Sequence, residues 1–335
     1  MKPENILEIR NLKVKFPVTA GLLLRKVAEV KAVDGIDLDL KTGETLGLVG
    51  ESGCGKSTIG KTVINILKFS APDVEITGEV WIRTEEGEVN ILRLENKGMR
   101  KYRGLIQMIF QDPYSSLNAR LSVGQIIEEP MLYHTKMNKK ERMERVAWLL
   151  GKVGLQAEQS KRYPHEFSGG QRQRIGIARA LATNPKIIIA DEPVSALDVS
   201  IQAQVINLLQ EIQNEFNLSL LFIAHDLSVV EHISSRISVM YLGSIVEIGP
   251  GKRIYHNPIH PYSKALLSAV PLPNPKRKNK DRIILKGDIP TPMNKPSGCG
   301  FRTRCPIARP ECATFIPPLE FKEFEHYAAC PFVSA

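Results

Sequence analysis

The alternation of apolar and polar residues predicts strands in the first part of the chain. Residues 6–9, 12–16 and 36–40 place apolar side chains at every second position, as half-buried strands do. Residues 45–49 form a continuous apolar run, which is typical of a buried parallel strand. A glycine-rich loop follows, and the segment from Ser57 to about Leu67 has helical spacing. This part of the chain therefore predicts strands that end in a strand–loop–helix unit.

The middle of the chain changes to helical spacing. We interpret residues from about 113 to 170 as a mainly helical subdomain, with a helix that Asn138 caps and Gly154 ends. Parallel-sheet character returns in the apolar runs 186–190 and 218–224. A crossover helix is predicted between them over residues 201–214, and residues 237–242 and 244–248 predict a hairpin.

The character of the chain changes again near Pro250, so we divide it into a domain of residues 1–250 and an extension of residues 251–335. A proline-rich and basic stretch at 271–280 is typical of a linker. The rest of the extension is too short to bury a core of its own. It is expected to need a metal as a staple or to dock on another surface.

Composition narrows the class of protein. The chain has 335 residues, of which 43% are hydrophobic and 24% charged, which excludes a wholly disordered or collagen-like protein. No apolar run is long enough to span a bilayer as a helix, and no secretory signal is evident, so the cytosol is the expected compartment. The net charge of +9 suits partners that carry phosphate, but by itself it does not choose among them.

The loop after the strand at 45–49 has the pattern of a P-loop. Residues 50–57 read G-E-S-G-C-G-K-S, with a predicted strand before and a helix after them. Glycines let backbone N–H groups surround a phosphate, and the following helix adds its positive end. Lys56 adds a point charge, and the Ser57 hydroxyl can bind Mg²⁺.

Two further motifs supply other parts of a nucleotide-binding site. The apolar strand at 186–190 ends in Asp191, placed to act on Mg²⁺ through water, and Glu192, a candidate general base. Ser168, Gly169, Gly170 and Gln171 stand before a helix predicted over 171–182 and form a second anion-binding helix start. Two phosphate-binding loops in one chain suggest that they serve different subunits.

With these motifs in order, the chain resembles the ATP-binding subunits of ABC transporters. Residues 50–57 are similar to Walker A, and Gln111 in the segment 110–113 to the Q-loop. Residues 168–171 match the signature, with Phe167 where leucine is commoner. Residues 195–198 are similar to the D-loop, and His225 to the switch histidine. The resemblance implies an α/β P-loop NTPase fold: a RecA-like core, a β-rich N-terminal subdomain and a helical subdomain.

The resemblance implies a mechanism. Two ATPase chains close head to tail, and each ATP lies between Walker A of one chain and the signature of the other. Glu192, His225 and Gln111 are the implied catalytic residues, and Ser57, Gln111 and Asp191 the implied Mg²⁺ ligands. Phe16 is the implied adenine-stacking residue, although a core role on a strand fits it nearly as well. The full implied ATP set is Phe16, Gly50, Ser52, Gly53, Cys54, Gly55, Lys56, Ser57, Thr58, Gln111, Glu192 and His225.

The resemblance narrows to the ATPases of oligopeptide and dipeptide importers. It rests on residues 114–118, 163–167 and 196–204, and on the tail segments 258–262 and 298–306. It implies a peripheral protein on the cytoplasmic face of the cell membrane. Two permease subunits, a second ATPase (a paralogue or a second copy) and, indirectly, a peptide-binding protein are the implied partners. Dipeptides, oligopeptides and nickel stay open as substrates.

Four of the five cysteines, Cys299, Cys305, Cys312 and Cys330, fall in the extension. Their clustering favours metal over disulfides in a cytosolic chain. Four thiolates suit Zn²⁺ or an iron–sulfur cluster, and the family resemblance favours [4Fe–4S]; free or disulfide-linked thiols are the third alternative. We expect Cys305→Ser to loosen the extension and to leave nucleotide binding intact, because the P-loop lies in another domain.

A nucleic-acid ATPase of DNA repair is the main alternative function. Such chains share the signature and would use the basic charge. They usually carry long coiled coils between Walker A and the signature, whereas here only 110 residues separate Lys56 from Phe167, without a sustained heptad pattern. A translation-type ATPase needs two cassettes, and this chain has one P-loop.

Overall fold

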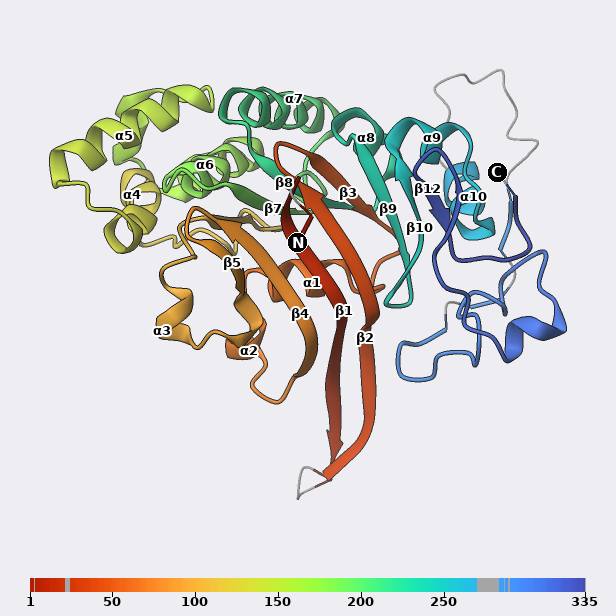
Figure 1. Cartoon of the computed structure of the whole chain (residues 1–335). Coiled ribbons are helices and arrows are strands. Elements are labelled where there is room, and N and C mark those ends of the chain that lie inside the picture. The colour runs from red at the N-terminus through yellow and green to blue at the C-terminus, as the bar shows by residue number, and fades with distance from the viewer. Residues whose placement is uncertain (3, 22–24, 270–282, 286, 289, 335) are drawn as a thin grey trace, which may run out of the picture. The chain divides into compact units, whose positions relative to one another are not determined.

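The computed structural model describes residues 1–2, 4–21, 25–269, 283–285, 287–288 and 290–334. Figure 1 labels the helices and strands of these residues. The chain divides into two compact units: unit 1 holds residues 1–6, 40–44 and 82–223, and unit 2 holds residues 7–39, 45–81 and 224–335. The predicted linker at 271–280 lies outside the described residues.

Unit 1 contains three parallel strands in the order β6 (Ile106–Ile109), β7 (Ile187–Asp191) and β8 (Ser219–Ala224). Every residue of β7 and β8 is buried, which explains why both are apolar throughout. α7 (Val199–Phe216) connects them, as the crossover helix predicted. The expected α/β core is therefore present in this unit.

The helical subdomain predicted near residues 113–170 is also present in unit 1. It contains α4 (Val123–His134), α5 (Lys139–Lys152) and the short η2 (Ala157–Lys161) and η3 (Pro164–Glu166), followed by α6 (Gly169–Leu181). Asn138 caps α5 as predicted: its side chain accepts from the Glu141 N–H, and the Glu141 carboxylate accepts from the Asn138 N–H.

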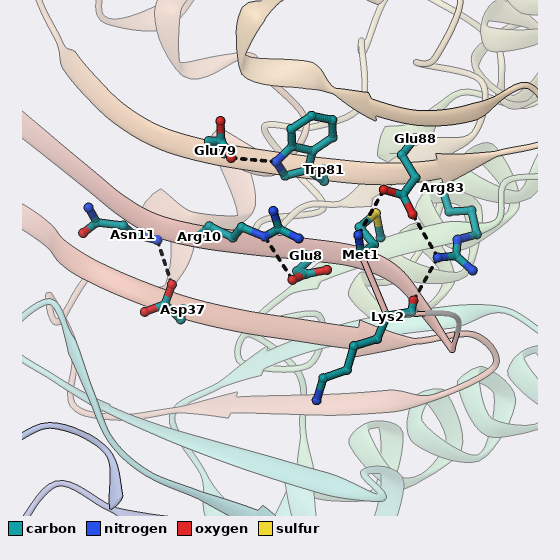
Figure 2. A network of polar contacts seen from close by, with 10 residues as sticks. All are labelled: Met1, Lys2, Glu8, Arg10, Asn11, Asp37, Glu79, Trp81, Arg83 and Glu88. Carbon is teal, nitrogen blue, oxygen red and sulfur yellow. Dashed lines mark hydrogen bonds and ion pairs between the residues drawn. The ribbon is translucent and has the colours of Figure 1, made fainter.

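The smaller elements of unit 1 are β5 (Gly87–Asn90), η1 (Ile91–Arg93) and α3 (Asn96–Met99). Polar contacts hold the first two residues of the chain next to Arg83 and to Glu88 of β5. The Met1 amino group lies 3.0 Å from Glu88, whose other oxygen accepts from Arg83 at 3.1 Å; Arg83 also donates to the Lys2 carbonyl (Figure 2). These contacts fix the first residues although they belong to no predicted element.

In unit 2, five strands of a sheet lie in the order β11 (Glu320–Glu323), β12 (His326–Ala328), β10 (Ser244–Pro250), β9 (Arg236–Tyr241) and β3 (Thr45–Val49). β3 is parallel to β9, and the other pairs are antiparallel. The predicted hairpin at 237–248 corresponds to β9 and β10. The extension adds two strands to the edge of this sheet, so it docks on the unit that carries the P-loop.

Long strands form the β-rich subdomain of unit 2. β2 (Arg25–Lys41), β1 (Asn5–Ala20) and β4 (Glu75–Thr84) lie in that order, and the Asn11 N–H donates to the Asp37 carboxylate at 2.8 Å (Figure 2). The separate strands predicted at 6–9 and 12–16 form the single strand β1, although Asn11 between them takes a left-handed conformation with φ of 43°.

The remaining helices of unit 2 are α1 (Lys56–Val63), α2 (Leu67–Ser70), α8 (Leu227–Ile233), α9 (Gly251–His256), α10 (Pro261–Ser268) and the short η4 (Pro310–Ala313). The single helix predicted from Ser57 to Leu67 is wrong in its second half. Asn65 takes a left-handed conformation with φ of 53°, which ends α1 and separates it from α2.

Candidate functional site

The P-loop lies between β3 and α1, as the sequence predicts. Gly55 caps α1 in the left-handed region, with φ of 111° and no side-chain hydrogen bond at the cap. A Cβ atom on Gly55 would lie 2.1 Å from the Ala32 carbonyl oxygen, so no other residue fits there without a backbone shift. The first turn of α1 has no acidic residue, and its positive end suits an anion.

The Lys56 side chain turns back into this loop and is only 4% exposed. Its ammonium donates to the carbonyls of Gly50 at 2.8 Å and Glu51 at 3.1 Å. Cys54 lies beside it and is buried, and this burial raises the pKa of the thiol. A neutral, buried thiol fits a packing role for Cys54 better than a redox role.

The other predicted ATP-site residues of unit 2 differ in how far they are exposed. Ser52 and Gly53 are exposed, whereas Ser57 and Thr58 are half-buried at the start of α1. Phe16 is half-buried on β1 and makes no ring contact with any residue that the structure describes. His225 is exposed directly before α8.

In unit 1 the structure brings two predicted residues together. The Gln111 amide donates to the Glu192 carboxylate at 2.9 Å. Asp191 ends β7 and is 3% exposed, and Glu192 follows it in a left-handed conformation with φ of 46°. Such a conformation is uncommon for glutamate. The Glu192 N–H donates to the Ile223 carbonyl at 2.9 Å.

The signature residues start α6. The Ser168 hydroxyl accepts from the Gln171 N–H at 3.4 Å, and the Gln171 side chain accepts from the Ser168 N–H at 3.0 Å. This capping box satisfies part of the helix start within the motif itself. A Cβ atom on Gly170 would lie 2.5 Å from an Ile201 methyl carbon, so close packing on α7 requires glycine there.

Arg172 fixes the signature loop from inside the same subdomain. Its guanidinium donates to the Pro164 carbonyl at 2.7 Å and stacks over the Tyr114 ring at 3.8 Å. Tyr114 comes shortly after Gln111 in the chain, so the segment behind the Q-loop residue contacts the signature helix. Tyr114 belongs to the segment 114–118 and Arg172 to the helix predicted over 171–182, but the sequence does not indicate their contact.

Two residues of the tail segments 258–262 and 298–306 contact the P-loop, and the sequence motifs do not indicate these contacts. The Tyr262 hydroxyl accepts from the Glu51 N–H at 2.9 Å, and Arg304 forms two contacts with the Glu51 carboxylate. The extension and the P-loop, which the sequence analysis assigns to different domains, are therefore in direct contact. Arg304 directly precedes Cys305.

The four cysteines of the extension fit a metal in kind but not in arrangement. All are half-buried free thiols, and a backbone hydrogen bond of 2.8 Å joins Cys299 to Cys312. Burial and, to a smaller extent, the neighbouring thiols together raise the pKa of Cys305 to about 11. Within the described ranges, however, no group of three or more His, Cys, Asp or Glu side chains is close enough to hold a metal ion.

A cavity of about 300 Å³ lies beside Cys299 in unit 2. Its wall includes Phe301, His260 and the ion pair between Lys295 and Asp34, whose atoms are 3.0 Å apart. The ion pair connects residue 295 of the extension to β2.

None of the helices in the described part of the chain has the length and apolarity needed to cross a membrane.

Family models match two parts of the chain. Residues 33–195 match a model described as ABC transporter, and residues 246–312 match one described as the C-terminal region of oligopeptide/dipeptide transporters. The first match contains the P-loop, Gln111, the signature and Glu192. The second contains three of the four clustered cysteines.

Curated relatives match nearly the whole chain. The oligopeptide transport ATP-binding protein AppF of Bacillus subtilis is 54% identical, over 99% of this chain and 98% of its own. The oligopeptide transport ATP-binding protein OppF of Escherichia coli is 55% identical, over 97% of this chain and 95% of its own. The dipeptide transport ATP-binding protein DppF of Haemophilus influenzae is 47% identical, over 94% and 93%.

Solved structures agree on the fold. A dimeric ATP-binding cassette bound to ADP and phosphate is 28% identical and covers 73% of this chain and 98% of its own, with a TM-score of 0.61. CbiO1 of Clostridium perfringens, part of an ABC transporter complex, is 26% identical and covers 76% and 92%, with a TM-score of 0.62.

Proposed function

This chain belongs to the family of ATP-binding subunits of oligopeptide and dipeptide ABC transporters, and from that premise we propose how its residues bind and hydrolyse ATP to power peptide import. It is an ATPase of the ABC fold. The observation that supports the proposal most is the P-loop with Lys56 inside it, in a chain that also pairs Gln111 with Glu192.

The P-loop binds the phosphates of ATP in this proposal. The start of α1 at Gly55 supplies backbone N–H groups and the positive helix end, and Lys56 supplies a full charge. A phosphate can replace the two carbonyl oxygens that Lys56 contacts, because charge-assisted hydrogen bonds to an anion are stronger than those to neutral carbonyls. Ser57, Gln111 and Asp191 would hold Mg²⁺, which neutralises charge that develops on the phosphates.

Glu192 acts as the general base in the same proposal. Its carboxylate accepts a hydrogen bond from Gln111, so the pair can hold an attacking water and sense the γ-phosphate. His225 is proposed to contact the γ-phosphate, and its exposure agrees with that role. Phe16 is proposed to stack on the adenine ring.

The partners follow from the signature loop. We assign Ser168, Gly169, Gly170 and Gln171 to the ATP of a second ATPase chain, in a head-to-tail dimer. Two of the similar solved cassettes are dimers, which supports this assignment. The second chain is a paralogue or another copy, and two permease subunits place the pair on the cytoplasmic face of the membrane, with a peptide-binding protein as an indirect partner.

The four cysteines of the extension are proposed to hold a [4Fe–4S] cluster. The number and kind of donors support it, since four cysteine thiolates are the usual ligands of such a cluster. In the described structure no three of these thiols lie close enough to hold a metal, so cluster binding would require them to move together. When bound, it would cross-link an extension that has little core of its own. Anaerobically purified protein should contain about four irons and four sulfides per chain. Stoichiometric zinc, or neither metal, would contradict the cluster, but it would not contradict the proposed ATP hydrolysis.

Reconstitution tests the transport function. The chain, co-expressed with its permeases and inserted into vesicles, should hydrolyse ATP and accumulate peptide only when the peptide-binding protein and ATP are present. The same preparation with Glu192→Gln is the matched control. Hydrolysis that DNA stimulates and peptide does not would favour the nucleic-acid ATPase instead.

A further inference from the structure

The P-loop residue Glu51 is held by a side chain from the C-terminal extension. The Arg304 guanidinium lies 2.8 Å and 3.0 Å from the two Glu51 carboxylate oxygens, one contact for each nitrogen. The two residues are 253 positions apart in the chain. Arg304 is 8% exposed and Glu51 21% exposed, so water screens the pair less than it screens a surface ion pair. Paired geometry of this kind fixes direction as well as distance.

The main chain of Glu51 is held at the same point. Its N–H donates to the Tyr262 hydroxyl at 2.9 Å, and Tyr262 is fully buried in α10. Its carbonyl accepts from Lys56 at 3.1 Å. Glu51 therefore connects the phosphate-binding lysine to two residues that lie far along the chain.

An aromatic cluster holds these two residues in place. Tyr241, Tyr262 and Phe301 have ring centres 4.6 to 5.4 Å apart, and all three side chains are buried. Phe301 comes from the extension, and its carbonyl accepts from the Arg304 N–H at 3.0 Å. Arg304 itself reaches the Tyr241 hydroxyl at 3.5 Å. Because buried aromatic rings have little freedom to move, the position of Arg304 is set by the core.

We infer that Arg304 and Tyr262 are positioning residues of the ATP site, which hold Glu51 so that the P-loop is ordered before phosphate arrives. This inference deepens the proposed ATP binding and rests on it. A loop held in its binding conformation loses less conformational freedom on binding. Without the Arg304 contact, ATP would have to order the loop itself, and its affinity would fall.

According to this inference, the C-terminal extension helps to order the ATP site in addition to carrying the four clustered cysteines. A purely structural ion pair is the competing explanation, in which Arg304 only fastens the extension to the core. The two differ in one measurable respect. A fastening role changes the melting temperature without changing ATP affinity in the folded protein, whereas a positioning role changes the affinity.

The experiment measures the Kd of Mg-ATP by calorimetry on the full chain, with the melting temperature of each variant. Arg304→Met removes the guanidinium and keeps much of the side-chain bulk. We expect its Kd to rise about 5- to 30-fold. Arg302→Met is the matched control, because Arg302 lies two residues away and its guanidinium donates to Ser297. Its Kd should not change.

Glu51→Gln breaks the same pair from the P-loop side and leaves the extension intact. It should raise the Kd by a similar factor, and the double variant should be no worse than either single variant. Tyr262→Phe, which removes one hydroxyl, should have a smaller effect in the same direction.

Folded Arg304→Met and Glu51→Gln proteins that bind ATP like the wild type would overturn the inference. If Arg304→Met does not fold or loses its metal content, the Kd of the Glu51→Gln protein tests the inference, because that variant leaves the extension intact. Absence of ATP binding by the wild-type chain would instead contradict the proposed function, so the two failures are distinguishable.

Discussion

The chain has two glycine-rich loops that start helices, and they are anchored in different ways. The signature loop at 168–171 is held by neighbours in sequence: Ser168 and Gln171 cap each other, and Arg172 donates to the Pro164 carbonyl. The P-loop at 50–57 begins its helix at Gly55 with no side-chain hydrogen bond at the cap. Its Glu51 is held instead by residues 211 and 253 positions away.

The difference shows how each loop relates to its ligand. A helix start that is already capped by its own side chains has fewer donors to offer, so it binds an anion weakly alone. A helix start without a side-chain cap keeps its donors for phosphate, but it needs other residues to hold its shape. We therefore expect the P-loop to set ATP affinity and the signature loop to act mainly in turnover.

Glu192→Gln is expected to have the largest effect on the rate of ATP hydrolysis and almost none on ATP affinity. The amide keeps an oxygen for Gln111 but cannot take a proton, so the rate of hydrolysis should fall about 100- to 10,000-fold. The Kd of ATP should stay within about twofold, because the change is less than 0.5 kcal/mol. Steady-state hydrolysis and calorimetry check the two expectations. Equal losses in both quantities would show that unit 1 also sets affinity.

Lys56→Ala tests the P-loop directly. The loss of a charge-assisted contact to phosphate, worth about 2 to 3 kcal/mol, should raise the Kd of ATP about 30- to 150-fold. Lys61→Ala is the matched control, because Lys61 lies in the last turn of the same helix. A wild-type Kd in the Lys56 variant would contradict the role of that lysine in binding.

Ser168→Ala tests the signature loop. Loss of the cap should lower the free energy of unfolding by about 1 kcal/mol. Turnover should fall while the Kd of ATP for the single chain stays unchanged. Ser122→Ala removes an equivalent capping box at the start of α4, in the same unit. It should show the same loss of stability with normal turnover; matched turnover in the two variants would mean that Ser168 acts only as a cap.

Mild acid should weaken the distant anchor of the P-loop. Burial lowers the pKa of His260, which caps α10 through the Tyr262 N–H, to about 4, despite the nearby Glu247 carboxylate. The unfolded chain therefore takes up the proton first, so stability is complete above pH 6.5 and is lost between about pH 6.5 and 4. At pH 6 the loss should be roughly 1 kcal/mol.

The matched variant for this pH effect is His260→Asn, which keeps a cap acceptor but does not titrate. Denaturant unfolding at pH 7 and pH 6 should show a smaller difference for the variant than for the wild type. An unchanged difference would assign the pH dependence to other groups.

Local pattern was sufficient for much of the fold. The strand at 45–49 and the helix that Asn138 caps match β3 and α5 closely, because periodicity and capping depend on neighbours in sequence. β11 and β12 did not show in the pattern, since they have four and three residues and form only by pairing, β12 onto β10 and β11 onto β12. The break at Asn65 depends on one backbone conformation that the helical spacing did not reveal.

The sequence by itself determined the chemistry: a P-loop with Lys56, an acidic strand end at Asp191 and Glu192, a signature and four clustered cysteines. These features depend on residue type at short spacing, which the sequence contains directly. Only the tertiary structure decided that Arg304 and Tyr262 hold the P-loop at Glu51. Contacts between residues more than 200 positions apart arise from the packing of the whole unit, and no local pattern encodes them.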